Sequence, residues 1–459
     1  QGEMLNINYG GVGQAPVTPI LLSMDEHGAV LRSNTAPGQG VLFTGKLRNG
    51  TYAYWIPRHR GGLFRILDSA SWQQIDTLQA AVGDSTDGHD LIWFANGSYA
   101  MLGVHIVVQD MTSRGGIDTA LVGWSTIQVF DADKNLVWRW DGYDHFGPAD
   151  IEKHITTNLK RPKAVDAMHS NSIDFDEAGN VIISSRHLCA ITKVHYPSGR
   201  VDWQLGGLKN TFTMQNDTTW FSYQHDARWL PNGHMLLFDN ANYDTTIGRK
   251  PVVYDTFSRA VEYALDTVAL TATHVWEYRH DPPVLSFAMG SAERLLPSGN
   301  TLIGWGAVPN GPFLVCTEVT PAGKTVFEMK DGDADYNYRV TKYPTAGQGI
   351  TGGDRYAGAP RATVAQSVAL PESASLDLSE PGGTSQELTI TYITATAGEV
   401  SMALYDALGR MVAEVAPTHF EPAGTHTAVA NLRALPSGAY YCVLRTPTGL
   451  ATRTFQHIR

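Results

Sequence analysis

The chain has 459 residues, of which 43% are hydrophobic and 17% charged, so it can bury cores large enough for more than one globular domain. Its formal net charge of −11 excludes general binding to a nucleic-acid backbone, because no basic surface can replace the counterions. No stretch approaches the roughly 18 uncharged apolar residues of a membrane-spanning helix. The 45 glycines and 23 prolines favour an all-β chain rich in turns.

A half-module consisting of an alternating strand, a turn and a second strand recurs along the chain. It occurs six times, at residues 22–31, 66–78, 129–138, 194–203, 253–276 and 317–327. A preceding half-module occurs only five times, beginning near Gly45, His89, His169, His225 and Ser291. The strand-like segment 336–343 can supply the missing half and so tie the two ends of the chain together. The repeats therefore predict a six-bladed β-propeller over residues 10–345.

Three of these preceding half-modules open with a histidine, namely His89, His169 and His225. Each histidine starts an apolar run that ends in a turn and returns as a second apolar run, which is typical of a β-hairpin. The first strand of each blade lines the central channel of a propeller, so the three imidazoles are expected to face one another.

An arginine and an asparagine are expected to join the histidines by hairpin pairing. Ser170 and Arg186 are equidistant from residue 178, so the returning strand should carry Arg186 back beside His169 and Asn171. A guanidinium fork and charged imidazoles bind tetrahedral oxyanions well. The sequence thus predicts an anion site at one mouth of the channel, although a lone channel histidine is more often a core residue.

Residues 346–386 shift to Gly, Ala, Ser, Pro and Thr without a sustained period and are expected to form a linker. Short alternating strands follow within residues 387–459, so a small Ig-like β-sandwich is predicted there. Gln1 at the start suits a mature exported protein, and a chain cut at that point explains it equally well. Cys189, Cys316 and Cys442 cannot all pair with one another and are interpreted as small buried hydrophobes.

Two weaker patterns leave alternatives open. Asp331, Asp333 and Asp335 have the alternating oxygen spacing of a calcium loop, but the glycine and the distal glutamate are missing, so a solvated acidic turn is favoured and no metal is assigned. Asp239 is equidistant with His225 from residue 232. It either orients that imidazole or is a simple carboxylate at the end of a strand.

The run 168–207 and the segment 221–240 together resemble the bacterial aryl-sulfate sulfotransferase family. The motifs that carry the resemblance are H-x-N at 169–171, S-S-R-H at 184–187, W-x-L-G-G at 203–207 and Q-H at 224–225. The similarity extends more weakly from about residue 85 to 345. It implies a six-bladed propeller that moves a sulfuryl group from an aryl sulfate to a phenol without PAPS or any other cofactor.

The resemblance also implies roles for individual residues. His225 would be the nucleophile that becomes sulfohistidine, whereas the residues themselves do not distinguish it from the other two histidines. His89, His169, Asn171 and Arg186 would hold the sulfuryl oxygens. A small hydroxyl is expected from the fifth blade, for which Ser291 is the best-placed candidate. Because blade-like sequence starts near Ile20, we expect no counterpart of the separate N-terminal domain of better-known members within these residues, and their cysteine pair near the active site is absent from them.

The last 75 or so residues resemble the C-terminal sorting domain of type IX secretion substrates. The segments that carry this resemblance are LYDALGRM at 404–411, LRALPSG at 432–438, AYYCVL at 439–444 and TRTFQHI at 452–458. The resemblance implies export across a Bacteroidota-type outer membrane to the cell surface or medium, with the secretion machinery as a partner. An ordinary C-terminal sandwich that docks on the propeller or binds a carbohydrate is the alternative.

Two functions from different classes stand at this point. One is an exported aryl-sulfate sulfotransferase that acts on an aryl sulfate and a phenolic acceptor. The other is a non-enzymatic cell-surface propeller that binds anionic or sulfated ligands or a protein partner.

Overall fold

The structure is a computed structural model, and it describes residues 2–9, 20–25, 29–35, 44–46, 51–56, 61–68, 70–94, 96–151, 165–241, 257–296, 298–308, 313–331, 336–344, 375–379, 387–394, 398–406, 411–422, 424–446 and 449–457. Within these residues every regular element is a β-strand, apart from four single 3-10 turns: η1 (Thr112–Arg114), η2 (Gly142–Asp144), η3 (Pro148–Asp150) and η4 (Arg186–Leu188). The predicted all-β class is therefore confirmed. None of the helical turns in the described part of the chain is long and apolar enough to cross a membrane.

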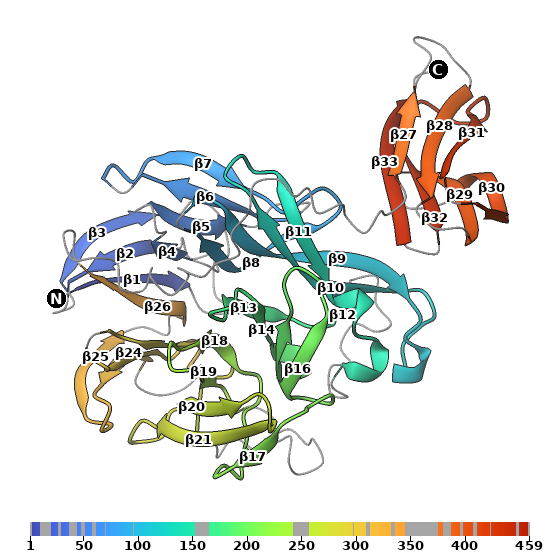
Figure 1. The fold of residues 1–459 in the computed structure, drawn as a ribbon. Helices are drawn as coiled ribbons and strands as arrows, with labels where there is room; N and C mark the ends of the chain where they lie inside the picture. The colour runs from blue at the N-terminus through green and yellow to red at the C-terminus, as the bar shows by residue number, and fades with distance from the viewer. Residues whose placement is uncertain are drawn as a thin grey trace. The chain divides into compact units, whose positions relative to one another are not determined.

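The chain divides into two compact units, residues 1–361 and residues 362–459. In the first unit the described strands form six sheets of four or five strands (Figure 1). In pairing order the first three sheets are β26 (Tyr336–Pro344), β1 (Gly2–Tyr9), β2 (Ile20–Met24), β3 (Val30–Thr35); β4 (Thr44–Lys46), β5 (Tyr52–Ile56), β6 (Leu63–Leu67), β7 (Gln74–Leu78); and β8 (Ser85–Trp93), β9 (Tyr99–Gln109), β10 (Ala120–Phe130), β11 (Leu136–Asp141), with β12 (Val165–Asp166) beside β10.

The other three sheets of this unit follow in chain order. They are β13 (Ser170–Phe175), β14 (Val181–Ser185), β15 (Ala190–Val194), β16 (Val201–Gly206); β18 (His225–Trp229), β19 (His234–Asp239), β20 (Arg259–Asp266), β21 (Thr271–Tyr278), β17 (Thr213–Gln215); and β22 (Ser291–Arg294), β23 (Thr301–Gly304), β24 (Phe313–Val319), β25 (Thr325–Asp331).

The six sheets form a closed ring. Each sheet contacts the next one in chain order, through β6 and β8, β8 and β13, β13 and β18, β18 and β22, β22 and β26, and finally β26 and β4. Figure 1 shows β13, β18 and β26 lying toward the centre, with the later strands of each sheet farther out. This arrangement is β-propeller-like, and it turns the first strands of the sheets toward one another.

Both ends of the first unit share one sheet. β1 lies between β26 and β2, with Leu5 opposite Thr341 on one side and Ser23 on the other. The expected sharing of a sheet by residues near 22–31 and 336–343 is confirmed, but β1 separates them and begins before the expected boundary at residue 10. Local pattern could not reveal β1, because its partner β26 comes from the far end of the unit.

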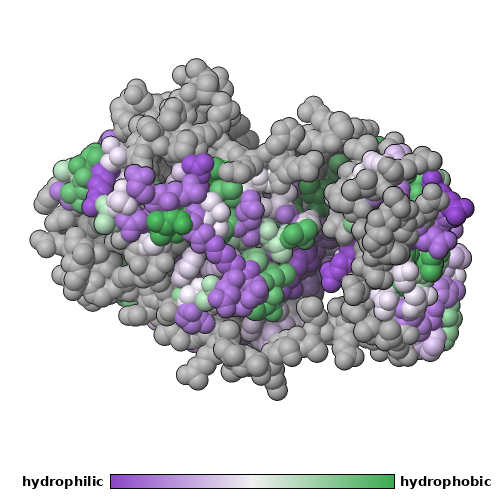
Figure 2. Space-filling view, turned by 90° about the horizontal axis from the view of Figure 1, so that it is seen from above, coloured by the Kyte–Doolittle hydropathy of each residue, from purple (hydrophilic) through white to green (hydrophobic). Residues whose placement is uncertain are grey.

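Apolar side chains fill the spaces between neighbouring sheets. One core lies between the sheets of β8–β11 and β13–β16 and contains Trp124 and Ile173, both fully buried. Another lies between the sheets of β18–β21 and β22–β25 and contains Phe238 and Trp305. Figure 2 shows that the described surface on the face in view is largely hydrophilic, with scattered hydrophobic residues. The ring is therefore held by packing between sheets as well as by its strand closure.

The second unit contains two sheets. One is β27 (Ser375–Ser379), β28 (Glu387–Thr394) and β31 (Gly424–Asn431); the other is β30 (Met411–Glu421), β29 (Gly398–Asp406), β32 (Gly438–Thr446) and β33 (Gly449–His457). Their core includes Ile390, Leu404 and Cys442, all fully buried. β27 corrects the expected linker 346–386, since it pairs along its length with β28. The rest of that linker lies outside the described residues.

Candidate functional site

The three predicted histidines occupy equivalent places on successive sheets. His89 lies in β8, His169 directly precedes β13, and His225 begins β18. The rings of His89 and His169 meet edge to face with centroids 4.8 Å apart. Burial and the charge of Arg186 hold the pKa of His225 well below its usual value, and His169 and His89 lie close enough to lower it further. We call His89, His169, His225 and Arg186 the histidine cluster.

Two of the cluster histidines are held by carboxylates. The Nδ1 of His89 contacts Asp87, and the Nδ1 of His169 lies 2.5 Å from the Asp166 carboxylate. Each carboxylate also accepts the backbone N–H of its own histidine, at 2.9 Å in both pairs. For both imidazoles no partner of Nε2 lies within the described residues, so Nε2 is the nitrogen left for a ligand.

His225 is held by neutral groups instead. Its Nδ1 lies 2.7 Å from Oδ1 of Asn240 and 3.0 Å from the carbonyl oxygen of Tyr223, and both of these are acceptors. Its Nε2 accepts the backbone N–H of Met289 at 3.2 Å. These partners assign the proton to Nδ1 and the lone pair to Nε2. His225 is 3% exposed, and burial is the largest cause of its lowered pKa. The side chain is therefore a neutral imidazole at neutral pH.

Arg186 carries a positive charge that is not paired with any carboxylate of the described residues. Among the described residues it makes no ion pair, and its buried Nε has no hydrogen-bond partner. Its Nη2 donates to the carbonyl oxygen of Phe287 at 3.4 Å, its Nη1 lies 3.1 Å from Nε2 of His187, and its guanidinium lies 4.2 Å from the ring centre of Tyr223. Burial lowers its pKa. An unbalanced buried cation is costly, and an anion is what would offset it.

Arg186 lies beside the cluster as predicted, but the strand pairing at Ser170 differs from the prediction by one residue. Ser170 pairs with Ser185 rather than with Arg186, because a bulge shifts the register between Ser170 and Ser172. The backbone N–H of Arg186 nevertheless donates to the carbonyl oxygen of His169 at 3.1 Å. The predicted adjacency holds, and η4 then places His187 against His169, with ring centroids 4.7 Å apart.

The segment 286–290 is a part of the site that sequence reasoning missed. It supplies the Phe287 carbonyl to Arg186 and the Met289 N–H to His225. Its backbone is fixed by Asn240, whose Nδ2 donates to the carbonyl oxygens of Ser286 and Met289. A side chain at Gly306 would meet backbone atoms of residues 288–290 at 2.6–2.7 Å. The segment lacks hydrophobic periodicity and charge, so no sequence signal marks it.

Asn171 and Ser291 are engaged mainly with backbone. Nδ2 of Asn171 donates to the carbonyl oxygen of Gln224 at 2.7 Å, which leaves its buried Oδ1 without a partner. The Ser291 hydroxyl donates to the carbonyl oxygen of Val340 and accepts the Val340 N–H, so it ties β22 to β26. Asn171 thus adjoins the residue before His225. The structure does not bring Ser291 into contact with the cluster.

Asn240, rather than Asp239, orients His225. The bulge between His225 and Arg228 sets His225 opposite Phe238, which shifts the pairing expected from hairpin symmetry. The Asp239 carboxylate instead lies 3.0 Å from the buried Arg259 and accepts the backbone N–H groups of residues 222 and 241. It is a carboxylate at the end of a strand, the second of the two alternatives.

The residues that follow two of the three histidines belong to a buried charge network. Asp90 follows His89 and Asp226 follows His225 in the chain; Arg228 lies 3.1 Å from Asp90 and 2.6 Å from Asp226, and Arg339 lies 3.0 Å from Asp90 and 3.1 Å from Asp226. We call these four residues the interior network. It connects β8, β18 and β26.

Left-handed backbone conformations concentrate at the site. His169, Tyr223, Asp226 and Met289 have φ values of 49°, 54°, 55° and 65°, and none of them is glycine. Such conformations are uncommon outside glycine and persist where surrounding contacts hold them. Here the Asp166 pair holds His169 and the interior network holds Asp226.

Asp166, His169 and His187 are the one group of metal-ligand residues that the described part of the chain brings within 4.8 Å. Both nitrogens of His187 are engaged, Nδ1 with the carbonyl oxygen of Asp166 and Nε2 with Arg186. A cation there would also lie beside a guanidinium. These residues therefore do not fit a metal site. Of the acidic segment that is interpreted as a solvated turn rather than a calcium loop, Asp333 and Asp335 lie outside the described residues.

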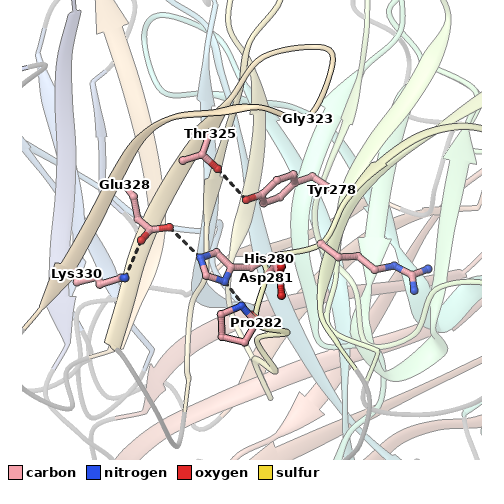
Figure 3. A pocket seen from close by; sticks show the side chains of 9 residues that line it. Tyr278, His280, Asp281, Pro282, Gly323, Thr325, Glu328 and Lys330 are labelled. Carbon is pink, nitrogen blue, oxygen red and sulfur yellow. Dashed lines mark hydrogen bonds and ion pairs between the residues drawn. The ribbon is translucent and has the colours of Figure 1, made fainter.

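A polar pocket of about 540 Å³ lies away from the cluster (Figure 3), lined by Tyr278, Arg279, His280, Asp281, Pro282, Gly323, Thr325, Glu328 and Lys330. Three of its polar groups pair with one another, because Glu328 lies 2.8 Å from both His280 and Lys330. Glu328 thus offsets the cationic groups that lie beside it in this pocket, whereas no described carboxylate pairs with Arg186 in the histidine cluster.

The chain was compared with solved structures and with curated proteins. Solved structures that resemble the chain include a protein of unknown function from Bacteroides caccae (12% identity, 74% of this chain and 98% of that one, TM-score 0.44), TolB from Acinetobacter baumannii (11%, 74% and 67%, TM-score 0.42) and a functionally unknown protein from Desulfotomaculum acetoxidans (10%, 74% and 98%, TM-score 0.39). With TM-scores below 0.5, they carry no argument about this chain. No curated protein matches it.

A protein-family model described as Arylsulfotransferase (ASST) matches residues 76–339. That range spans more than half of the 459 residues and contains the whole histidine cluster and segment 286–290. The chain therefore belongs to the arylsulfotransferase family.

Proposed function

We propose that this protein transfers a sulfuryl group from an aryl sulfate to a phenol through a covalent intermediate on His225. The observation that carries the proposal is the contrast in the groups that orient the three histidines. His89 and His169 are held by carboxylates, whereas His225 is held by an amide and a carbonyl. The arrangement at His225 keeps its imidazole neutral with a lone pair on Nε2, which a nucleophile requires.

The first half-reaction follows from this geometry. Nε2 of His225 attacks the sulfur, the bond from sulfur to the aryl oxygen breaks, and the phenolate leaves with the bonding electrons. Nδ1 keeps its proton, which Asn240 and the Tyr223 carbonyl accept throughout. The Met289 N–H, which loses its acceptor when Nε2 attacks, becomes a donor for a sulfuryl oxygen.

Arg186 and the open Nε2 atoms of His89 and His169 would hold the remaining sulfuryl oxygens. Sulfuryl transfer spreads negative charge over these oxygens. Prepositioned cationic donors therefore lower the reaction barrier more than a stronger nucleophile would. In the second half-reaction the acceptor phenol gives its proton to solvent and the phenolate oxygen attacks sulfur. The nitrogen–sulfur bond breaks, its electron pair returns to Nε2, and His225 is again neutral. No cofactor or metal takes part in either step.

The test is a set of single substitutions assayed with 4-nitrophenyl sulfate and a phenol. His225→Ala is expected to abolish release of 4-nitrophenol, since no other group can form the intermediate. His169→Ala and Asn171→Ala are expected to slow release without abolishing it. Equal residual activity in His225→Ala and His169→Ala would contradict the assignment, and no turnover with any aryl sulfate would favour a non-enzymatic propeller that binds anionic ligands.

We further infer that the six sheets are the blades of one six-bladed propeller and that the second unit is an Ig-like sandwich. The resemblance of residues 387–459 to type IX sorting domains supports a proposal that this unit directs export to the cell surface or medium. Deleting it should leave the protein in the periplasm of its native host. Normal surface delivery of the shortened chain would overturn that proposal.

A further inference from the structure

His187 is an imidazole at the site to which the family resemblance assigns no role. It lies in η4, directly after Arg186, and its backbone N–H donates to the carbonyl oxygen of Met168 at 2.9 Å, which fixes its place beside the cluster. Its ring stacks on that of His169, with centroids 4.7 Å apart and an angle of 28° between the planes. Its Nε2 lies 3.1 Å from Nη1 of Arg186. His187 therefore contacts two members of the histidine cluster.

We propose that His187 is the positioning residue of Arg186. Its Nε2 accepts a hydrogen bond from Nη1 of Arg186 and so holds the guanidinium in the orientation that binds the sulfuryl oxygens. This inference rests on the proposed function for the reaction that it serves, whereas binding of an anion at Arg186 tests it without turnover. His187 acts through Arg186 and has no contact with the substrate, so it is not a catalytic residue.

The hydrogen-bond partners of His187 fix its tautomer. Nδ1 lies 2.8 Å from the carbonyl oxygen of Asp166, which can only accept, so Nδ1 carries the proton. Nε2 then carries a lone pair, which is the acceptor that the N–H of Arg186 requires. The carboxylate of Asp166 meanwhile contacts Nδ1 of His169. Asp166 thus orients both stacked imidazoles, one through its side chain and the other through its backbone.

The surroundings of His187 keep it neutral. Burial is the largest cause, and the charges of His169 and Arg186 act in the same direction, so the pKa of His187 is lowered to about 3 although Asp166 opposes the change. A protonated imidazole has no lone pair to accept a hydrogen bond and would repel the guanidinium. His187 is therefore an acceptor throughout the pH range in which an ordinary histidine titrates.

The contact with His187 decides which edge of the guanidinium is left for a ligand. Nη1 of Arg186 is committed to His187. Nε has no hydrogen-bond partner among the described residues, and Nη2 has only a long contact of 3.4 Å with the carbonyl oxygen of Phe287. Nε and Nη2 form one edge of the planar group, and such an edge binds two oxygens of a tetrahedral oxyanion. The nitrogen that His187 holds is the one that this edge does not use.

A neutral imidazole is suited to this role because it holds Arg186 without offsetting its charge. A carboxylate in the same place would hold the guanidinium as firmly, but it would also neutralise the group that attracts the anion. The ring of Tyr223 lies 4.2 Å from the guanidinium, which limits tilting of the group but not its rotation in its own plane. The contact of 3.4 Å with Phe287 is too long to fix that rotation. His187 supplies the missing restraint.

The experiment measures the Kd of inorganic sulfate by calorimetry and the rate of 4-nitrophenyl sulfate cleavage. His187→Phe keeps a flat ring against His169 but removes the acceptor, and it should worsen both quantities by about 10–100-fold, since a small misplacement of a binding group can cost that much. His187→Gln, whose side-chain oxygen can reach the place of Nε2, should recover most of the loss. His195→Phe, which follows β15 at the end away from η4, is the matched control and should change neither quantity.

A double substitution separates positioning from a structural role. In Arg186→Ala the group that His187 holds is gone, so adding His187→Phe should slow cleavage no further and leave the Kd of sulfate unchanged. Melting temperatures show whether each variant folds, and His187→Asn, which keeps a donor for the Asp166 carbonyl oxygen, replaces His187→Phe if that variant does not.

Two results would overturn the proposal. One is an equal loss from His187→Phe with and without the Arg186 side chain. The other is a His187→Gln variant that is no better than His187→Phe. If the parent protein transfers no sulfuryl group, the proposed function fails, and the Kd of sulfate still tests the role of His187.

Discussion

The histidine cluster and the interior network lie one residue apart along β8 and β18, yet they handle charge in opposite ways. In the interior network two guanidinium groups face two carboxylates at 2.6–3.1 Å. In the histidine cluster no described carboxylate pairs with Arg186, and beside it the Oδ1 of Asn171 has no donor among the described residues. Buried charges that pair with one another, as in the interior network, hold the sheets together. A buried charge without a paired carboxylate, as at Arg186, is suited to bind an anion.

The largest expected effect comes from breaking the interior network. Asp226→Ala leaves Arg228 and Arg339 buried without one of their two carboxylates, and it should lower the free energy of unfolding by about 3–5 kcal/mol. Denaturant unfolding monitored by tryptophan fluorescence measures the change. Asp133→Ala, at an exposed carboxylate, is the control and should stay within about 0.5 kcal/mol of the parent protein. A loss as small for Asp226→Ala would remove the structural role of the network.

The matching change in the histidine cluster should cost activity rather than stability. Arg186→Ala should slow donor cleavage by about 10²–10³, the usual cost of one transition-state charge donor. The free energy of unfolding should stay equal or rise, because an uncompensated buried charge is removed. Arg186→Lys is expected to recover little of the rate, since lysine lacks the planar fork. Marked destabilisation by Arg186→Ala would show that its charge is balanced after all.

Inorganic sulfate should stabilise the folded protein by binding at Arg186 in the histidine cluster and not at the interior network, whose charges are already paired. An anion bound at Arg186 stabilises the folded protein by about 2.7 kcal/mol at a concentration 100 times its Kd. Sulfate also raises the stability of proteins in general, so the readout is the difference in melting temperature between the parent protein and Arg186→Ala. The parent protein should gain more. Equal gains would place no specific anion site at Arg186.

The smallest expected effect is that of removing residues 362–459. The second unit has its own core around Ile390 and Leu404, and separate cores fold separately. The melting temperature of the first unit and its transferase activity should therefore stay unchanged. Loss of the thermal transition after truncation would show that the two units share one core.

The extent to which the site could be predicted depended on the range of the interactions. His89, His169 and His225 were accessible because each opens a repeated half-module, and Arg186 followed from hairpin symmetry. Asn240 was missed because a bulge shifts the register after His225, and such a shift leaves no mark in hydrophobic alternation. Segment 286–290 was missed because it acts through backbone groups, which any residue can offer.

The fold shows the same dependence on range. The paired strands of each half-module were accessible from alternation and turn residues. β1 and β27 were not, because each is defined by a partner that local pattern does not specify: β26 at the far end of the first unit for β1, and β28 across the expected linker for β27. Ser291 was placed in the right strand, but its hydroxyl binds the backbone of Val340, a role visible only in three dimensions.

The central claim is that His225 carries the sulfuryl group. The most direct measurement is mass spectrometry of peptides from protein quenched after incubation with 4-nitrophenyl sulfate in the absence of a phenol. We predict an acid-labile sulfuryl adduct on the peptide that contains His225, which disappears when a phenol is added and never forms in His225→Ala. An adduct on His89 or His169, or full turnover without any adduct, would contradict the account.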